Sequence, residues 1–184
     1  KDASSTLSRA KPYSLNTTIQ NQQGIWVVNQ LHASVANSTV DLSARISDNP
    51  QHVGSAFQIN AEGRNIENLI GPWVAHPLPS LPFTVSVDVK LAEQNLHIKH
   101  LSVTVGEHEL TGSLFVDKPP NFSETSGDLT LKGPSVNQLA EFLGLEHEFL
   151  ERSYQGSFQL QGTRSELILD SLDLTVGESD LSGW

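Results

Sequence analysis

The sequence predicts a mainly β protein made of repeated antiparallel β-meander units, and two observations carry this prediction. The chain repeats itself, because residues 96–112 return as residues 167–183, a shift of 71 (167 − 96). The unit also begins with a strict alternation of apolar and polar residues, which is the period of a strand. Self-similarity at a fixed period is typical of modular arrays. We expect a period of ~70 residues, about four strands plus one short helix per unit, and a curved, groove-like sheet.

The first strand of the unit is clearest at residues 83–91. Its odd-numbered residues are apolar and its even-numbered residues are polar. This period of two predicts a strand with one apolar and one polar face. The same strand is expected at residues 154–160 and, with a weaker pattern, at residues 13–19.

The second strand carries a shift of phase that occurs in all three copies. Its apolar positions run through Leu96 and Ile98 and then resume at Leu101. The same slip separates two other pairs, Leu169 from Leu172 and Val28 from Leu31. A β-bulge or a strand corner produces such a slip, because one extra residue turns the following side chains back to the same face. The recurrence therefore predicts a bend at this place in every unit.

A hairpin turn and a third strand come next. Residues 106–107, Gly-Glu, are expected to form the turn, because glycine tolerates positive φ. Residues 177–178 repeat this dipeptide. The third strand is expected at residues 110–116. It ends before Pro119 and Pro120, since proline cannot donate to a strand ladder.

The unit closes with a short fourth strand and a short helix. The fourth strand holds Leu129 and Leu131, and residues 59–61 correspond to it in the first copy. Apolar residues at 136, 139, 140 and 143 follow an i, i+3, i+4, i+7 spacing, which predicts an amphipathic helix that ends at Gly144. The counterpart of this helix in the first copy is residues 65–71.

These elements divide the chain into three units. Residues 12–81 form a diverged first unit, residues 82–152 a second and residues 153–184 a truncated third. The segment 71–82 contains four prolines and is expected to be a semi-rigid connector. Because the chain contains no methionine and stops partway through the third unit, we expect it to be a fragment of a larger protein.

Composition argues against several classes of function. The chain has 11 Lys+Arg against 21 Asp+Glu, a net charge of −10, so we expect no nucleic-acid partner and no electrostatic docking on anionic headgroups. It has no cysteine and therefore neither a disulfide framework nor a thiolate metal site. No run of about 18 apolar residues is present, so no segment is predicted to span a membrane.

The residues that could do chemistry do not form a catalytic or metal-binding motif. His97 and His100 lie on either side of the phase slip and have no counterpart in the other copies. Residues 146–148, Glu-His-Glu, lack the second histidine that a helical zinc motif needs. Asp170 and Asp173 are expected at outward strand positions as solvated charges. No nucleophile elbow, phosphate loop or dinucleotide fingerprint occurs, so we expect no enzyme activity, no cofactor and no metal.

Three segments carry an ordered set of motifs: two strands, a Thr/Ser-Val-Gly-Glu-x-x-Leu-x-Gly hairpin, a strand, then Leu-x-Leu-x-Gly and a short helix. They are residues 101–114, 127–136 and 172–183. In this order the chain resembles the AsmA-like family of Gram-negative envelope proteins, relatives of TamB. The resemblance covers residues 82–184 and, loosely, the first unit, which departs from it by having Ala36-Asn37 at the hairpin.

The resemblance implies a location and a function. Proteins of this family are large, anchored in the inner membrane and extended across the periplasm, with repeats that stack into a curled sheet around an apolar groove. They serve phospholipid transport between the two membranes or outer-membrane biogenesis. This chain would then be a non-catalytic periplasmic module, with its anchor outside the chain. Its partners would be phospholipid or another apolar chain, the adjacent repeats and other envelope proteins.

The residues support a groove independently of the resemblance. A sheet with every apolar side chain on one face must bury that face under protein or under an apolar ligand. The short helices can cover only part of four strands. The candidate groove-lining residues are Phe83, Val85, Val87, Val89, Leu101, Val103, Val105, Leu110, Leu114, Leu129 and Leu131. The alternative for the same residues is an ordinary closed β-core packed under the helices.

Two other functions compete with a lipid groove. In the first, the chain is a structural or adaptor module that binds a protein partner by edge-strand addition, for which residues 181–184 would leave an open strand. In the second, it is a carbohydrate-binding β-sandwich. That function needs exposed aromatic platforms, and Trp26, Trp73 and Trp184 are too scattered in the sequence to predict one.

Overall fold

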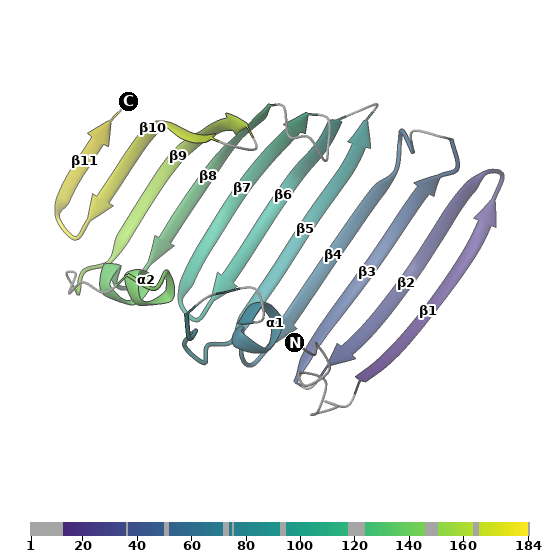
Figure 1. The fold of residues 1–184 in the computed structure, drawn as a ribbon, viewed down its shortest axis with the longest axis horizontal. Coiled ribbons are helices and arrows are strands. Elements are labelled where there is room, and N and C mark those ends of the chain that lie inside the picture. Colours follow the sequence, from purple (N-terminus) through teal and green to yellow (C-terminus); the bar gives the residue numbers. More distant parts are fainter. Residues whose placement is uncertain are drawn as a thin grey trace, which may run out of the picture.

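The computed structural model describes residues 13–35, 37–49, 52–71, 74, 76–92, 95–117, 124–145, 151–163 and 166–183. It contains eleven strands in one open sheet, in which each strand pairs antiparallel with the next along the chain (Figure 1). The prediction of a mainly β, antiparallel meander is confirmed. The strands are β1 (Tyr13–Gln22), β2 (Ile25–Val35), β3 (Ser38–Ser47), β4 (Ala56–Gly63), β5 (Phe83–Ala92), β6 (Asn95–Val105), β7 (His108–Asp117), β8 (Thr125–Gly133), β9 (Tyr154–Thr163), β10 (Glu166–Val176) and β11 (Ser179–Gly183).

The predicted phase slips are β-bulges. Asn29 in β2, Lys99 in β6 and Asp170 in β10 are each one residue in excess of the pairing with the preceding strand. The extra residue restores the apolar side chains that follow it to the face they had left. Without this correction, the two halves of each long strand would present their apolar residues to opposite faces.

The predicted hairpin turn is also confirmed. β6 and β7 are joined by Gly106 and Glu107, and Gly106 has φ of 59°. Its counterpart Gly177 has φ of 61° and joins β10 to β11. A residue with a Cβ is disfavoured at these angles, whereas glycine adopts them freely. The corresponding turn of the first unit includes Ala36, which lies outside the described residues.

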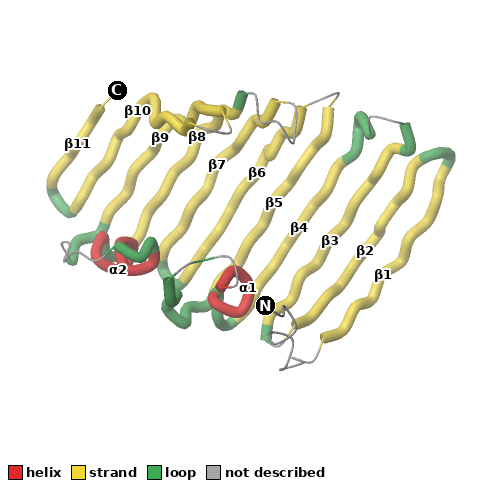
Figure 2. The backbone as a smooth tube through the Cα atoms, in the orientation of Figure 1, coloured by secondary structure: helices red, strands yellow, loops and turns green. Residues whose placement is uncertain are grey.

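Two short helices interrupt the meander. Helix α1 (Glu67–Ile70) follows β4, and helix α2 (Val136–Phe142) follows β8. The N-cap Ser135 of α2 accepts a hydrogen bond from the Gln138 amide at 3.2 Å. Both helices lie at the same end of the sheet (Figures 1 and 2). The predicted helices are therefore present, and α1 is shorter than the segment 65–71 proposed for it.

A cluster of buried apolar residues lies under these helices, and other buried apolar residues lie toward the opposite ends of their strands: Val27, Val28, Ala44 and Val116. Ile66, beside α1, is 4 % exposed and packs with Ala61, Phe83 and Val105 from β4, β5 and β6. Partly buried residues surround this cluster: Val40, Ile70, Leu81, Val85, Val103 and Phe142. The sheet consequently has a second layer only at one end of its strands, and over the rest of its area the described residues form a single layer (Figure 2).

Candidate functional site: the two faces of the open sheet

The strand registers align apolar side chains into rows that cross the sheet. In one row, Ile59 of β4 lies opposite Val87 of β5, which lies opposite Leu101 of β6. The row continues in both directions through Leu31, Leu42, Gly112, Leu129, Phe158 and Leu172. Successive side chains of a strand point to opposite faces, so residues in register share a face. One face of the sheet is therefore apolar from β2 to β10.

All eleven predicted groove-lining residues lie on this apolar face. Their registers place them on β5, β6, β7 and β8 with one phase, which the bulge at Lys99 preserves. They divide into two groups. Four belong to the core under the helices or pack against it: Phe83, Val85, Val103 and Val105. The other seven are half-buried and lie outside that cluster: Val87, Val89, Leu101, Leu110, Leu114, Leu129 and Leu131.

The two groups correspond to the two alternatives for these residues, a closed β-core and an apolar groove. At the helix end of the strands, the apolar residues form an ordinary packed core. Away from the helices, no described helix covers the apolar face, and its residues range from buried, as for Val28, Ala44 and Val116, to half-buried. Near the margins its side chains are strongly exposed, as for Leu15 at 65 %, Ile19 at 56 % and Leu169 at 54 %. An apolar surface of this extent is typical of a binding surface.

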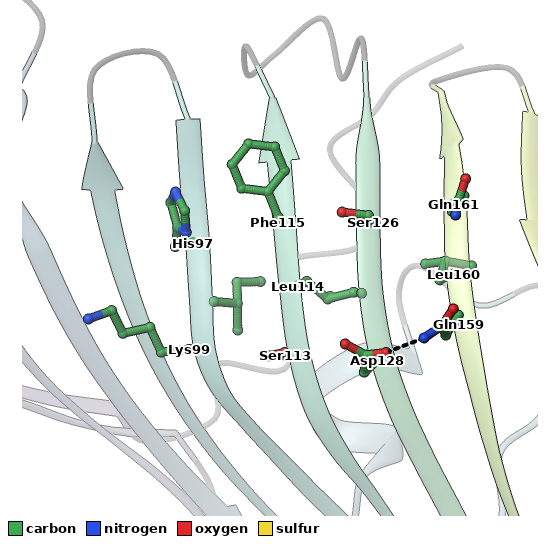
Figure 3. A pocket seen from close by; sticks show the side chains of 12 residues that line it. His97, Lys99, Ser113, Leu114, Phe115, Ser126, Asp128, Gln159, Leu160 and Gln161 are labelled. Atoms are coloured by element: carbon green, nitrogen blue, oxygen red, sulfur yellow. Dashed lines mark hydrogen bonds between the residues drawn. The ribbon is translucent and has the colours of Figure 1, made fainter.

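The opposite face is polar and holds shallow depressions. A depression of about 490 Å³ lies between two rows of side chains on β6 to β9 (Figure 3). The first row contains His97 and Phe115, whose rings meet edge to face with centroids 4.8 Å apart. The second contains Asp128, which accepts a hydrogen bond from Gln159 Nε2 at 3.1 Å.

The predicted outward positions of the acidic residues agree with this arrangement. Asp170 and Asp173 are exposed, and Asp170 accepts a hydrogen bond from Gln161 at 3.0 Å. His100 is exposed as well. Residues 146–148 lie outside the described part of the chain. Among the residues described, no group of three or more His, Cys, Asp or Glu side chains could hold a metal ion.

A buried His–Tyr pair lies at the helix end of β7, β8 and β9. Nδ1 of His108 lies 2.8 Å from the hydroxyl oxygen of Tyr154, and their rings stack with centroids 6.0 Å apart. Burial lowers the pKa of His108, although a hydrogen bond to Gln138 and the charge of Glu107 oppose this shift. Burial also raises the pKa of Tyr154 to about 12. The fold thus favours the neutral form of both groups.

The His108 environment predicts a loss of stability in acid. Because the folded state lowers the pKa of His108 below its usual 6.5, protonation favours the unfolded chain. The contribution of this group is present above about pH 6.5 and is lost as the pH falls from there to the lowered pKa. We expect the urea midpoint of the wild type to fall more steeply with pH in this window than that of His108→Gln. Parallel pH profiles for the two proteins would contradict the prediction.

Several features of the two faces were not predicted. The predicted groove-lining residues lie only on β5–β8, whereas the apolar row extends to Leu31 and Leu172. The signal was present, because the same alternation runs through the first and third units. The depressions of the polar face had no signal in the sequence, since their residues come from strands that only the sheet brings together.

No protein-family model, no curated protein and no solved structure matches this chain. Within the described residues, no helix has the length and apolar character needed to cross a membrane.

Proposed function

We propose that this chain is a non-catalytic module that binds the acyl chains of phospholipid on the apolar face of its sheet. One observation carries the proposal: the apolar rows cross the sheet with glycines but no polar side chain in them, while α1 and α2 cover only one end of the strands. Placing an acyl chain of about 14 methylenes there would release up to ~10 kcal/mol, at ~0.8 kcal/mol per methylene, before ordering costs.

The arrangement of elements supports a module within a longer array. α1 follows four strands and α2 follows the next four, and the bulges recur at Asn29, Lys99 and Asp170. These positions favour a unit of four strands and a period of about 70 residues. Among the described strands, β1 and β11 each pair on one side only, so further units could extend the sheet at either edge and prolong the apolar face into a groove.

The cellular setting of the proposal comes from the resemblance to AsmA-like proteins. In that setting the apolar face would conduct phospholipid between the inner and outer membranes, as part of the periplasmic region of a membrane-anchored protein, and so contribute to outer-membrane biogenesis. The chemistry of the face is suited to this role, since lateral movement of an acyl chain requires continuous apolar contacts and no buried polar barrier.

Two adjacent residues of β6 provide a matched test. Leu101 lies on the apolar face, and Ser102 lies on the polar face; both are half-buried. We expect Leu101→Asp to weaken binding of a fluorescent phospholipid at least tenfold, because a carboxylate would have to be desolvated under the acyl chain. Ser102→Asp adds the same charge and should change binding less than twofold.

The measurement is a titration of the 184-residue chain purified without detergent, together with native mass spectrometry to detect retained phospholipid. Circular dichroism of both variants checks that the sheet is intact. A lipid-free wild type that does not bind the fluorescent phospholipid would refute the proposal.

A second candidate function is supported by strand β1. Every residue of β1 is exposed, and its outer edge is unpaired in the described structure. Such an edge can take up a strand from a protein partner. Concentration-dependent self-association in the absence of lipid, measured by sedimentation velocity, would favour this adaptor function over the lipid-binding one.

A further inference from the structure

We propose that the polar face carries an anion site for a phosphate ester, formed by Arg45, Lys90 and Lys99. These residues line one depression of about 450 Å³ over strands β2 to β6. The site lies on the face opposite to the proposed acyl-chain surface and does not depend on that function.

The sheet register creates the hollow. Arg45 of β3 lies opposite Ala56 of β4, which lies opposite Lys90 of β5. Because neighbouring strands are ~4.8 Å apart, the two long cationic residues rise from backbones ~10 Å apart. Ala56 between them is too short to fill the space. An anion of the size of a phosphate group fits over Ala56, within reach of both flanking side chains.

The bulge in β6 directs a third cation to the same place. Lys99 is the extra residue of that bulge, and its side chain leans over β5, away from Ser113 (Figure 3). Bulges re-aim side chains in this way. The bulge that keeps the apolar face in phase therefore also brings Lys99 to the depression on the other face.

The concentration of positive charge is unusual for this chain. The described residues include six Lys and Arg, in a chain of net charge −10, and three of them line this depression: Arg45, Lys90 and Lys99. Lys99 also borders the depression over β6 to β9. None of the three forms an ion pair with another described residue, whereas Lys132 pairs with Glu109 at 2.8 Å. Unpaired cations that share a concave surface concentrate anions there.

The other groups at the depression agree with a phosphate ligand. Asp88 is the one carboxylate among its lining residues, so the three cations leave an excess of two positive charges. Asn29, Ser43 and Gln58 also line it and can donate hydrogen bonds. An arginine fork with lysine point charges is suited to the oxygens of a phosphate ester. A long polyanion is disfavoured by the acidic remainder of the surface.

The test compares two double variants of equal charge by isothermal titration calorimetry at low ionic strength. Lys90→Gln/Lys99→Gln removes two cations of the site, and Lys132→Gln/Arg152→Gln removes two cations outside it. With glycerol 3-phosphate as the probe, we expect the site variant to bind at least tenfold more weakly than wild type and the control variant to remain within twofold. Added salt should weaken the wild-type interaction.

Two results would overturn the proposal: no saturable binding by the wild type, or equal weakening in both variants. The source of the phosphate is addressed by repeating the titration with dihexanoyl phosphatidic acid below its critical micelle concentration. The ligand is a lipid headgroup if the phosphatidic acid binds more tightly than glycerol 3-phosphate. This tighter binding should be lost in Lys90→Gln/Lys99→Gln and kept in Leu101→Asp. Equal affinity for the two probes shows that the site binds the phosphate ester alone and that the acyl chains contribute nothing to binding. Failure of acyl-chain binding alone leaves this site unaffected.

Discussion

Replacement of Phe83 by alanine is expected to lower the free energy of unfolding by about 3–5 kcal/mol, the usual cost of removing a buried aromatic ring. Phe83 is 2 % exposed and lies at the centre of the cluster with Ala61, Ile66 and Val105. This cluster holds α1 onto the sheet, and the strands around it cannot collapse into the space of a lost ring. Because domains of this kind are stable by only about 5–15 kcal/mol, the variant would be partly unfolded under mild conditions.

Phe115 provides the matched control for this prediction. It is also a strand phenylalanine, but it is half-buried on the polar face and contacts His97 at the rim of an open depression. Phe115→Ala should lose less than half as much stability, because its ring buries less area and leaves no enclosed cavity. The measurement is urea unfolding followed by circular dichroism. Equal losses in the two variants would show that the helix-covered end is not the principal core.

The second large effect is expected at Gly133, the last residue of β8. A methyl group there would collide with the imidazole of His108 and with the ring of Tyr154, whose hydroxyl oxygen would lie 2.6 Å away. His108 and Tyr154 belong to the strands on either side, so neither can move without disturbing its own ladder. We expect Gly133→Ala to lower the free energy of unfolding by about 1–3 kcal/mol, as overpacking of a core usually does.

Ser157→Ala is the control for this prediction, since it places the same side chain at an exposed position of β9 and should change stability by less than about 0.5 kcal/mol. Both variants are compared with wild type by urea unfolding at neutral pH. A Gly133→Ala protein as stable as the control would mean that the strands separate readily at this point. The first unit offers a repetition of the test, because a methyl group on Gly63 would meet Ser38 and Phe83 in the same way.

The bulges and strands could be predicted from the sequence because both are local. A strand alternates with a period of two, and a bulge changes the phase of that alternation, so the slip between Ile98 and Leu101 is visible in the order of residues. The turn at Gly106 is equally local, since its φ of 59° favours glycine. The one-face placement of the eleven apolar candidates follows from the same periods.

The coverage of that face could not be predicted in the same way. Whether Val85 belongs to a core and Val87 to an open surface depends on where α1 lies, and the helix is placed by contacts of Ile66 with three separate strands. The period of two is identical for both valines. Their difference arises from packing between residues that are distant in sequence.

The character of the two faces of the sheet follows from the local order of residues, through the alternation within each strand and the bulges that keep it in phase. Which residues of different strands become neighbours depends on the tertiary structure. Arg45 and Lys90 lie on either side of Ala56 because β4 pairs with β3 on one side and with β5 on the other. The alternation of side chains is set within a strand and can be read from neighbouring residues. The register between strands is set by hydrogen bonds to residues distant in the sequence, and no local pattern specifies those partners.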